Sequence, residues 1–264
     1  MTKGQMMMGA VESGPRVVGL YRYAVKGLSP EQLNEVSLVV GETVPLDRAY
    51  AIENGPSRFD PVSPRHLPKT NFLMLMRDEK LATLQTRLDP DTHILIISRQ
   101  GRPVARGDLR TKIGRQIIEQ FIAAYMADSL RGPPKIVSAP GHSFSDMAAK
   151  CLHIVNLASV RALEKLIKRP VHPLRFRANI YLDGFEPWEE LNWLERELVI
   201  GHARMKVFHR TRRCDATNVD PETGARDMAI PATLQRTFGH SDFGIYAEVT
   251  AAGRVAAGDS VRVV

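Results

Sequence analysis

Short β-prone runs separated by turn residues are the feature that most limits how this chain of 264 residues can fold. The runs are rich in β-branched and aromatic residues, and glycine or proline closes many of them. On this pattern we expect strands at residues 17–21, 36–40, 49–52, 92–98, 104 onward, 152–155, 179–182, 198–200, 205–208, 245–250 and 260–263. The last two are expected to form a closing hairpin around Gly253 and Gly258. Many short strands with few helices predict a β-rich α+β protein with a barrel-like sheet, not a doubly wound sheet.

One amphipathic helix is expected near the middle of the chain. Its apolar residues recur every four positions, at Ile113, Ile117, Phe121 and Tyr125, with Ile118 and Ile122 alongside. Thr111 is a suitable N-cap for this helix, and the Gly-Pro-Pro at residues 132–134 ends the segment. We therefore expect a flexible tail at residues 1–14, a smaller β-rich unit at residues 15–130 and a second β-rich unit at residues 135–264.

Two shorter helices are expected in the second half of the chain. Ser159 has the chemistry of an N-cap and precedes a helical run that Pro170 ends. Pro231 suits the first turn of a helix that continues to Phe238.

Composition and charge exclude several classes of protein. The hydrophobic fraction of 44% suffices for a packed core, and no apolar run approaches the roughly 18 residues of a membrane-spanning helix. We expect a cytoplasmic protein with no membrane partner. The net charge of +7 favours an anionic partner. Nucleic acid is disfavoured, because aromatic residues make up only 6% and no recognition helix or zinc-finger spacing is visible.

The two cysteines, Cys151 and Cys214, are too few for a disulfide scaffold or for an iron–sulfur cluster held by four protein thiolates. Cys214 follows Arg212 and Arg213, whose positive charge favours a thiolate that can bind a metal or attack an electrophile. A well-defined turn is predicted directly after it, at residues 218–224. Cys151 begins an apolar run and is expected to be buried and inert. A basic cluster is equally typical of a solvated face, so these residues alone leave the role of Cys214 open.

Four short motifs, in this order, resemble those of the MOSC family, the C-terminal domain of molybdenum cofactor sulfurase together with its N-terminal β-barrel companion. They are residues 21–27, 47–50, 176–180 and 213–224, and residues 239–246 and 257–261 fit as well. The resemblance covers residues 16–264. It implies a MOSC-type β-barrel with a smaller N-terminal β-barrel-like unit and a few helices.

The resemblance also implies a molybdenum–molybdopterin cofactor. By position, Cys214 would ligate the molybdenum and act as the catalytic residue, and the residues that would contact the cofactor are Lys26, Arg48, Arg177, Asn179 and Arg213. The residue chemistry agrees, because a soft thiolate suits a sulfur-coordinated metal and guanidinium groups suit phosphate oxygens. Pyridoxal phosphate binding is a further property that the family resemblance implies.

The similarity to amidoxime and N-hydroxylamine reductases implies an oxidoreductase that reduces small N-hydroxylated molecules. Its electrons would come from a separate ferredoxin-like or flavoprotein donor. Arg212 stands where the reductase-like members often carry serine, and a bulky cation at this position could change substrate access or close the site to some substrates. Two alternatives stay open: a cofactor carrier or sulfur-transfer protein with a persulfide on Cys214, and a nucleic-acid binder that uses the basic surface.

Overall fold

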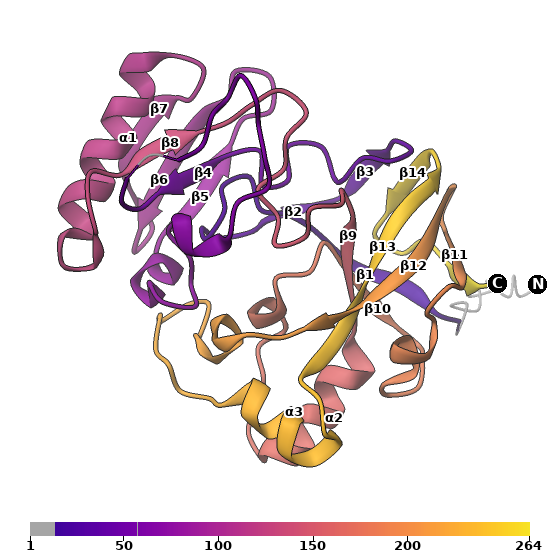
Figure 1. Ribbon diagram of the computed structural model, residues 1–264. Helices are drawn as coiled ribbons and strands as arrows, with labels where there is room; N and C mark the ends of the chain where they lie inside the picture. The colour runs from indigo at the N-terminus through magenta and orange to yellow at the C-terminus, as the bar shows by residue number, and fades with distance from the viewer. Residues whose placement is uncertain (1–13, 57) are drawn as a thin grey trace, which may run out of the picture.

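Within residues 14–56 and 58–264, which the computed structural model describes, eight strands form one sheet (Figure 1). In spatial order they are β15 (Val261–Val263), β11 (Glu197–Ile200), β12 (Ala203–Arg212), β13 (Asp242–Ala251), β9 (Leu152–Asn156), β10 (Ile180–Asp183), β1 (Arg16–Arg22) and β2 (Glu31–Leu33). Neighbouring strands are antiparallel except β9 and β10, which are parallel. The predicted tail at residues 1–14 lies outside the described residues apart from Gly14.

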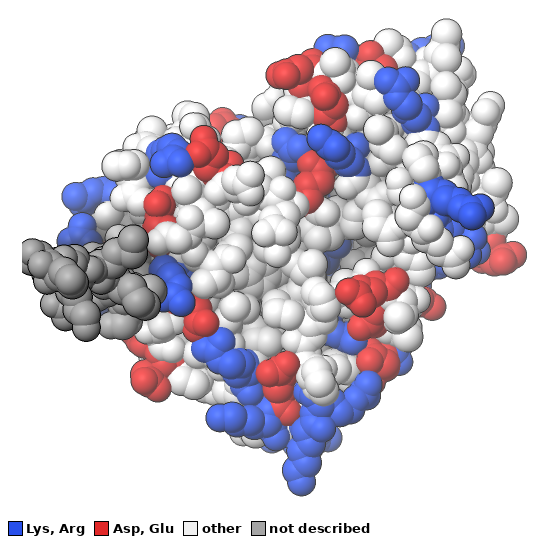
Figure 2. Space-filling model, turned by 180° about the vertical axis from the view of Figure 1, so that it is seen from behind, with Lys and Arg blue, Asp and Glu red and all other residues white. Residues whose placement is uncertain are grey.

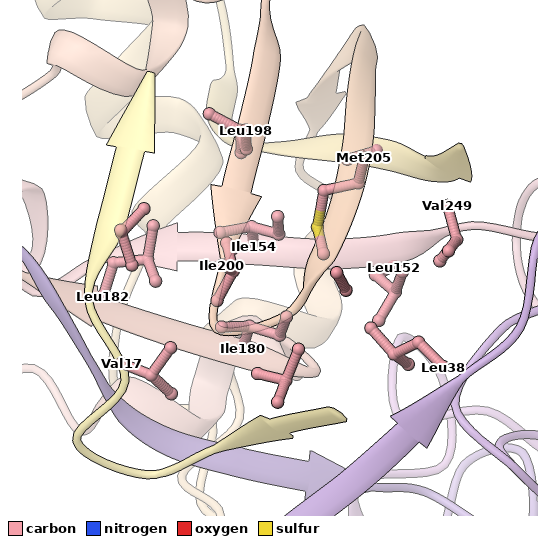
Figure 3. Close-up of a cluster of buried hydrophobic side chains, with 14 of the residues drawn as sticks. Val17, Leu38, Leu152, Ile154, Ile180, Leu182, Leu198, Ile200, Met205 and Val249 are labelled. Atoms are coloured by element: carbon pink, nitrogen blue, oxygen red, sulfur yellow. The ribbon is translucent and has the colours of Figure 1, made fainter. Parts of the chain in front are cut away.

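The eight-stranded sheet surrounds a core of aliphatic side chains (Figure 3). Val17, Ile180 and Leu198 come from three different strands and lie in this one interior. The strands alternate with a period of two: Met205 on β12 is buried in the core, whereas the next residue, Lys206, is exposed. The structure therefore confirms the β-rich α+β class with a barrel-like sheet.

The remaining strands form three small sheets, which lie at the upper left and at the upper right of Figure 1. The pairs and the triplet are β3 (Glu35–Leu38) with β14 (Gly253–Ala256), β4 (Ala51–Glu53) with β8 (Lys135–Val137), and β5 (Gln85–Leu88) with β6 (Ile94–Arg99) and β7 (Arg102–Asp108). A second apolar core lies between β4, β5, β6, β8 and the central helix, whereas β3 and β14 contribute to the core of the large sheet.

Helices are few, as expected. The described residues contain three α-helices, α1 (Lys112–Tyr125), α2 (Leu157–Ile167) and α3 (Ile230–Phe238). Short 3-10 helices lie at η1 (Lys69–Asn71), η2 (Glu79–Thr83), η3 (Ala127–Ser129), η4 (Pro173–Phe176), η5 (Glu189–Asn192) and η6 (Asp215–Asn218). None of the helices in the described part of the chain has the length and apolar character needed to cross a membrane.

Helix α1 begins where the sequence predicts. The Thr111 hydroxyl caps it by accepting the N–H of Gly114 at 3.0 Å. The buried face, however, is formed by Ile118 and Ile122, while Ile113 is 72% exposed. The series with four-residue spacing therefore marks the edge of the apolar face and not its centre.

The predicted cap of α2 is wrong by three residues. Asn156 caps the helix, and its side-chain oxygen accepts the N–H of Ala158 at 3.0 Å. Ser159 lies inside the helix and is buried, and its hydroxyl donates instead to the carboxylate of Glu190 at 2.8 Å. Asn156 ends a buried strand, so the chain passes from strand to helix without the loop that the prediction assumed.

The predicted closing hairpin is also wrong. β13 pairs with β12 and β9, and β15 pairs with β11. The intervening β14 leaves the large sheet and pairs with β3. The turn residues suggested a hairpin, but the last strands pair with partners that are distant in the sequence and not with each other.

Strand pairing crosses the boundaries proposed between the two halves. β1 and β2, from the first half, complete the edge of the large sheet beside β10. β8, which follows the Gly-Pro-Pro segment, pairs back with β4 of the first half. The units at residues 15–130 and 135–264 remain a prediction, and the two halves share strands in both directions.

Gly114→Ala should destabilise the protein although alanine favours helices. A Cβ at this position would lie 2.1 Å from the carbonyl oxygen and 2.5 Å from the amide nitrogen of Asp108, both backbone atoms of β7. The higher helix propensity of alanine would add roughly 1 kcal/mol of stability. The new Cβ would force α1 away from β7, which costs more than this gain. We therefore expect the free energy of unfolding in urea to fall by about 2 kcal/mol. Gly14→Ala is the control, because a Cβ there meets nothing within 4 Å. Equal stability of the two variants would contradict the packing described.

Candidate functional site

A cavity of about 310 Å³ lies where the two halves of the chain meet. The first half contributes segments at residues 26–27, 47–48, 69 and 74–76, and the second half contributes residues from the loop at 145–147 to the strand β13. All six residues singled out from the sequence line it: Lys26, Arg48, Arg177, Asn179, Arg213 and Cys214. Lys26, Arg48 and Arg177, which are far apart in the sequence, thus line one cavity.

The cavity lining is strongly cationic. Among the described residues that line it, six are Lys or Arg and two are Asp. The Lys26 ammonium donates to the carbonyl of Phe144 at 2.8 Å and to the carboxylate of Asp146 at 2.6 Å. Burial lowers the pKa of Lys26, while Asp146 acts in the opposite direction. Asp146 thus fixes the position of Lys26 in the cavity wall, and no sequence motif had indicated this ion pair.

Two arginines share the ring of the buried Tyr23. The guanidinium carbons of Arg48 and Arg177 lie 4.3 and 4.4 Å from its centroid. Arg48 also donates to the carboxylate of Asp47 at 2.5 Å and to the backbone carbonyl of Arg177 at 3.0 Å. Both arginines have left-handed backbones, with φ of 48° and 54°. Such conformations are rare for residues other than glycine and often mark functional sites.

Arg177 differs from Arg48 in having no acidic partner. Its guanidinium makes no hydrogen bond or ion pair with any residue in the described part of the chain. Burial lowers its pKa to about 10, and the nearby Arg48 adds to this effect. A cation that is charged yet poorly compensated is a binding position for an anionic group.

Arg213 and His153 are neighbouring residues of the cavity lining. Arg213 donates to the carbonyl of Phe176 at 2.8 Å, and its other terminal nitrogen lies 3.3 Å from Nε2 of His153. Burial holds the pKa of His153 well below its usual range, and Arg213 and Arg48 lower it further. The imidazole is therefore neutral and can accept from Arg213. The Nε atom of Arg213 is buried and has no hydrogen-bond partner among the described residues.

Asn179 lines the cavity and has a structural role there. Its side chain donates to the carbonyl of Tyr21 at 3.2 Å and accepts the N–H of His153 at 3.1 Å. It thereby ties β1, β9 and β10 together. Both polar atoms of Asn179 are used in the fold, which limits what it can offer to a ligand.

Cys214 stands directly after β12 and immediately before the 3-10 helix η6. It is half-buried and lines the cavity. The predicted turn is present: the carboxylate of Asp220 accepts the N–H groups of Glu222 and Thr223 at 3.0 and 2.8 Å. The buried Arg175 then binds Asp220 at 2.9 Å, so the segment after the cysteine is anchored.

Cys151 is buried, as predicted, but it also lines the same cavity. Burial raises the pKa of its thiol to about 12. It is therefore a neutral thiol at neutral pH. Its place in the cavity wall was not predicted, because an apolar run shows burial but not what lies beside it.

Several lining residues had no signal in the sequence. Asp146 and Tyr246 are single polar residues outside any recognisable pattern of charge, and only Tyr246 lies within a stretch that resembled the family. The apolar part of the wall comes from Met74, Leu75 and Met147. These positions become visible only when distant segments are brought together.

Residues 140–262 match the family model of the MOSC domain. This chain contains a MOSC domain. The matched segment supplies Arg177, Arg213 and Cys214, whereas Lys26 and Arg48 lie outside it, so the cavity extends beyond the MOSC match.

Curated relatives match less than half of this chain. Mitochondrial amidoxime reducing component 2 of Rattus norvegicus is 32% identical over 122 residues, 42% of this chain and 36% of the relative. The human component 2 is 31% identical over 122 residues, with the same coverage of 42% and 36%. Molybdenum cofactor sulfurase of Drosophila willistoni is 33% identical over 112 residues, 41% of this chain and 14% of the relative. The match thus spans about a third or less of the length of these relatives.

Solved structures give more distant likenesses. YuaD from Bacillus subtilis covers 94% of both chains with a TM-score of 0.43 and 11% identity. YiiM from Geobacillus stearothermophilus covers 43% of this chain and 53% of its own, with a TM-score of 0.35 and 20% identity.

Proposed function

We propose that this MOSC-domain protein binds a molybdenum–molybdopterin cofactor in the cavity, and that it reduces small N-hydroxylated substrates with electrons from a separate donor protein. One observation carries the proposal: a thiol and an excess of positive charge converge on one cavity from both halves of the chain. The amidoxime reducing components among the relatives support the choice of reaction.

The residues present fit such a group. The cofactor is polyanionic, and Arg177 together with the unpartnered Nε of Arg213 offers donors that the protein itself does not use. No group of three or more His, Cys, Asp or Glu suited to hold a metal ion occurs among residues 14–56 and 58–264. In the proposal Cys214 is accordingly one ligand, and the cofactor brings the others. A thiolate is a suitable ligand for a sulfur-coordinated transition metal.

Each residue then has a defined task. Cys214 would hold the metal, Arg177 and Arg213 would bind anionic oxygens of the pterin, and Lys26 and Arg48 would fix the positive wall. The bound cofactor would supply the two-electron chemistry that cleaves an N–O bond. Neutral His153 keeps Arg213 oriented.

The electrons must come from another protein. With two cysteines this chain cannot supply four thiolates for an iron–sulfur cluster. A ferredoxin-like or flavoprotein donor is the partner we propose.

A cofactor carrier or sulfur-transfer protein is the second candidate. The molybdenum cofactor sulfurase of Drosophila pseudoobscura pseudoobscura is 36% identical over 96 residues, which favours this reading. A persulfide on Cys214 would then be the reactive group. The third alternative, nucleic-acid binding, has less support: on the face shown in Figure 2, basic side chains are interspersed with acidic ones and with broad uncharged surface.

A reductase assay on protein made in a cofactor-producing cell separates the first two candidates. We expect an N-hydroxylated aryl amidine to be reduced to the amidine when a chemical reductant supplies the electrons. Metal-loaded protein that fails to reduce the probe, and that carries a cyanide-labile sulfur on Cys214, would favour sulfur transfer.

Arg177→Ala should weaken the affinity for the pterin by about 10- to 100-fold, which corresponds to the loss of one charge-assisted hydrogen bond. The purified variant should therefore contain less pterin than wild type. The control is Lys168→Ala. Lys168 is exposed, lies outside the cavity and also has a left-handed backbone, with φ of 58° against 54° for Arg177. The two positions share a left-handed backbone, and the melting temperature of each variant reports the loss of the Arg177 contact with Tyr23 separately from the pterin content. Equal pterin content in both would contradict the role of Arg177.

A further inference from the structure

The cofactor proposal leaves two cations of the cavity without a task, Lys69 and Arg212. Lys69 has an acidic neighbour, the carboxylate of Asp146 at 3.9 Å. Arg212 ends β12, is exposed, and lines the cavity together with the exposed His209 on the same strand. Cys214 follows it by two positions. A side chain here can reach a molecule that approaches the thiol from solvent.

No carboxylate neutralises Arg212. The guanidinium of Arg212 makes no hydrogen bond or ion pair with any residue in 14–56 and 58–264. Its cross-strand neighbour is Asp242, but the ionic neighbour of that carboxylate is His240, with Nδ1 at 3.8 Å.

The two acidic residues that line the cavity are engaged elsewhere. Asp47 accepts from Arg48 at 2.5 Å, and Asp146 accepts from Lys26 at 2.6 Å. The guanidinium of Arg212 therefore has its donors available for an oxyanion, and its planar fork matches the geometry of a carboxylate.

Another part of the lining is apolar. Met74 and Leu75 are buried there, and Met76 and Met147 are half-buried. Thioether side chains adapt to flat or irregular apolar groups and make favourable contacts with aromatic rings. The cavity thus offers an apolar surface for the body of a ligand and a free cation at its exposed side.

We propose that Arg212 selects substrates that carry a carboxylate on an apolar body, so that the preferred substrate is an anionic N-hydroxylated compound. This rests on the proposed reductase function. Arg212 acts as a specificity-determining residue, while the cofactor is held by Arg177 and Arg213.

Two probes of the same shape test the selection. One is an aryl amidoxime with a para carboxylate, and the other carries a neutral para carboxamide. The variants are Arg212→Gln, the charge-retaining Arg212→Lys, and Arg102→Gln as a control, since Arg102 is exposed on β7 and outside the cavity. Binding of both probes is measured by calorimetry, and turnover is measured with a chemical reductant.

We expect wild type to prefer the carboxylate, and Arg212→Gln to lose about tenfold of that preference in kcat/KM, through KM more than kcat. Arg212→Lys should retain part of it, and Arg102→Gln all of it. An unchanged preference in Arg212→Gln overturns the proposal. So does a loss of pterin in Arg212→Gln, because Arg212 would then be a cofactor contact.

The binding measurement keeps the two proposals separate. If neither probe is turned over by metal-loaded protein, the reductase function fails. Binding then tests the selection by Arg212 on its own. Tighter binding of the carboxylate probe than of the carboxamide in wild type, but not in Arg212→Gln, supports it, and equal binding of the two probes in wild type contradicts it.

Discussion

Cys214→Ser should abolish N–O reduction while the protein stays folded. The exchange replaces a soft sulfur donor with a hard oxygen of nearly the same size at the cavity wall. Loss of residues that merely support a metal ligand costs about 10- to 100-fold, so loss of the ligand itself should lower activity by more than about 100-fold. Because Cys214 is half-buried, the free energy of unfolding of the variant should differ from that of wild type by no more than about 0.5 kcal/mol.

Cys151→Ser is the matched control for that result. Cys151 lines the same cavity but is buried, with a thiol whose pKa is raised to about 12. A hydroxyl in its place should cost about 1–3 kcal/mol of stability if it finds no partner, and molybdenum content should persist. Molybdenum, activity and melting temperature are measured for both variants. Full activity in Cys214→Ser together with inactivity in Cys151→Ser would show that the wrong cysteine has been chosen.

Glu190→Gln should remove a large pH dependence of stability. Glu190 is fully buried in η5, and its carboxylate accepts from Ser159 at 2.8 Å and from Asn156 at 3.2 Å. Its second oxygen has no partner among the described residues. Burial raises its pKa from 4.5 to about 7, so between these values the folded protein holds a proton that the unfolded chain has released.

The sign follows from proton linkage. Where the folded state binds more protons, stability falls as pH rises. As the pH rises from acidic values to well above 7, the free energy of unfolding of wild type should therefore fall by about 3 kcal/mol relative to that of Glu190→Gln. The depressed pKa of His153 acts in the opposite direction, but it is common to both proteins and cancels in their difference.

Urea unfolding of both proteins at several pH values measures this difference. Glu248→Gln, which removes an exposed carboxylate from β13, is the control and should run parallel to wild type. Parallel curves for wild type and Glu190→Gln would contradict the buried, protonated carboxyl group.

Local sequence signals predicted the elements better than their partners. The Thr111 cap and the Pro231 helix start are short-range features, and both are present. The pairing of β15 with β11 and of β14 with β3 depends on contacts across the whole chain, so turn residues misassigned it. Ser159 was misread for a related reason, since its partner Glu190 lies 31 positions away in sequence.

The cavity was predictable only in part. Lys26, Arg48 and Arg177 were identified through motif resemblance, because isolated basic residues are ordinarily surface residues. Asn179 was chosen in the same way, yet its polar atoms serve the sheet. The partner Asp146 could not be predicted, since nothing near it in sequence indicates that it lies against Lys26.

The content of the purified protein tests the central claim most directly. The chain is produced in a cell that makes molybdopterin, and molybdenum is measured by mass spectrometry and pterin by fluorescence after oxidation. We predict equal molar amounts of molybdenum, pterin and protein, with molybdenum lost from Cys214→Ser. Folded wild-type protein that carries neither molybdenum nor pterin under these conditions, and takes up neither when they are supplied, would contradict the account.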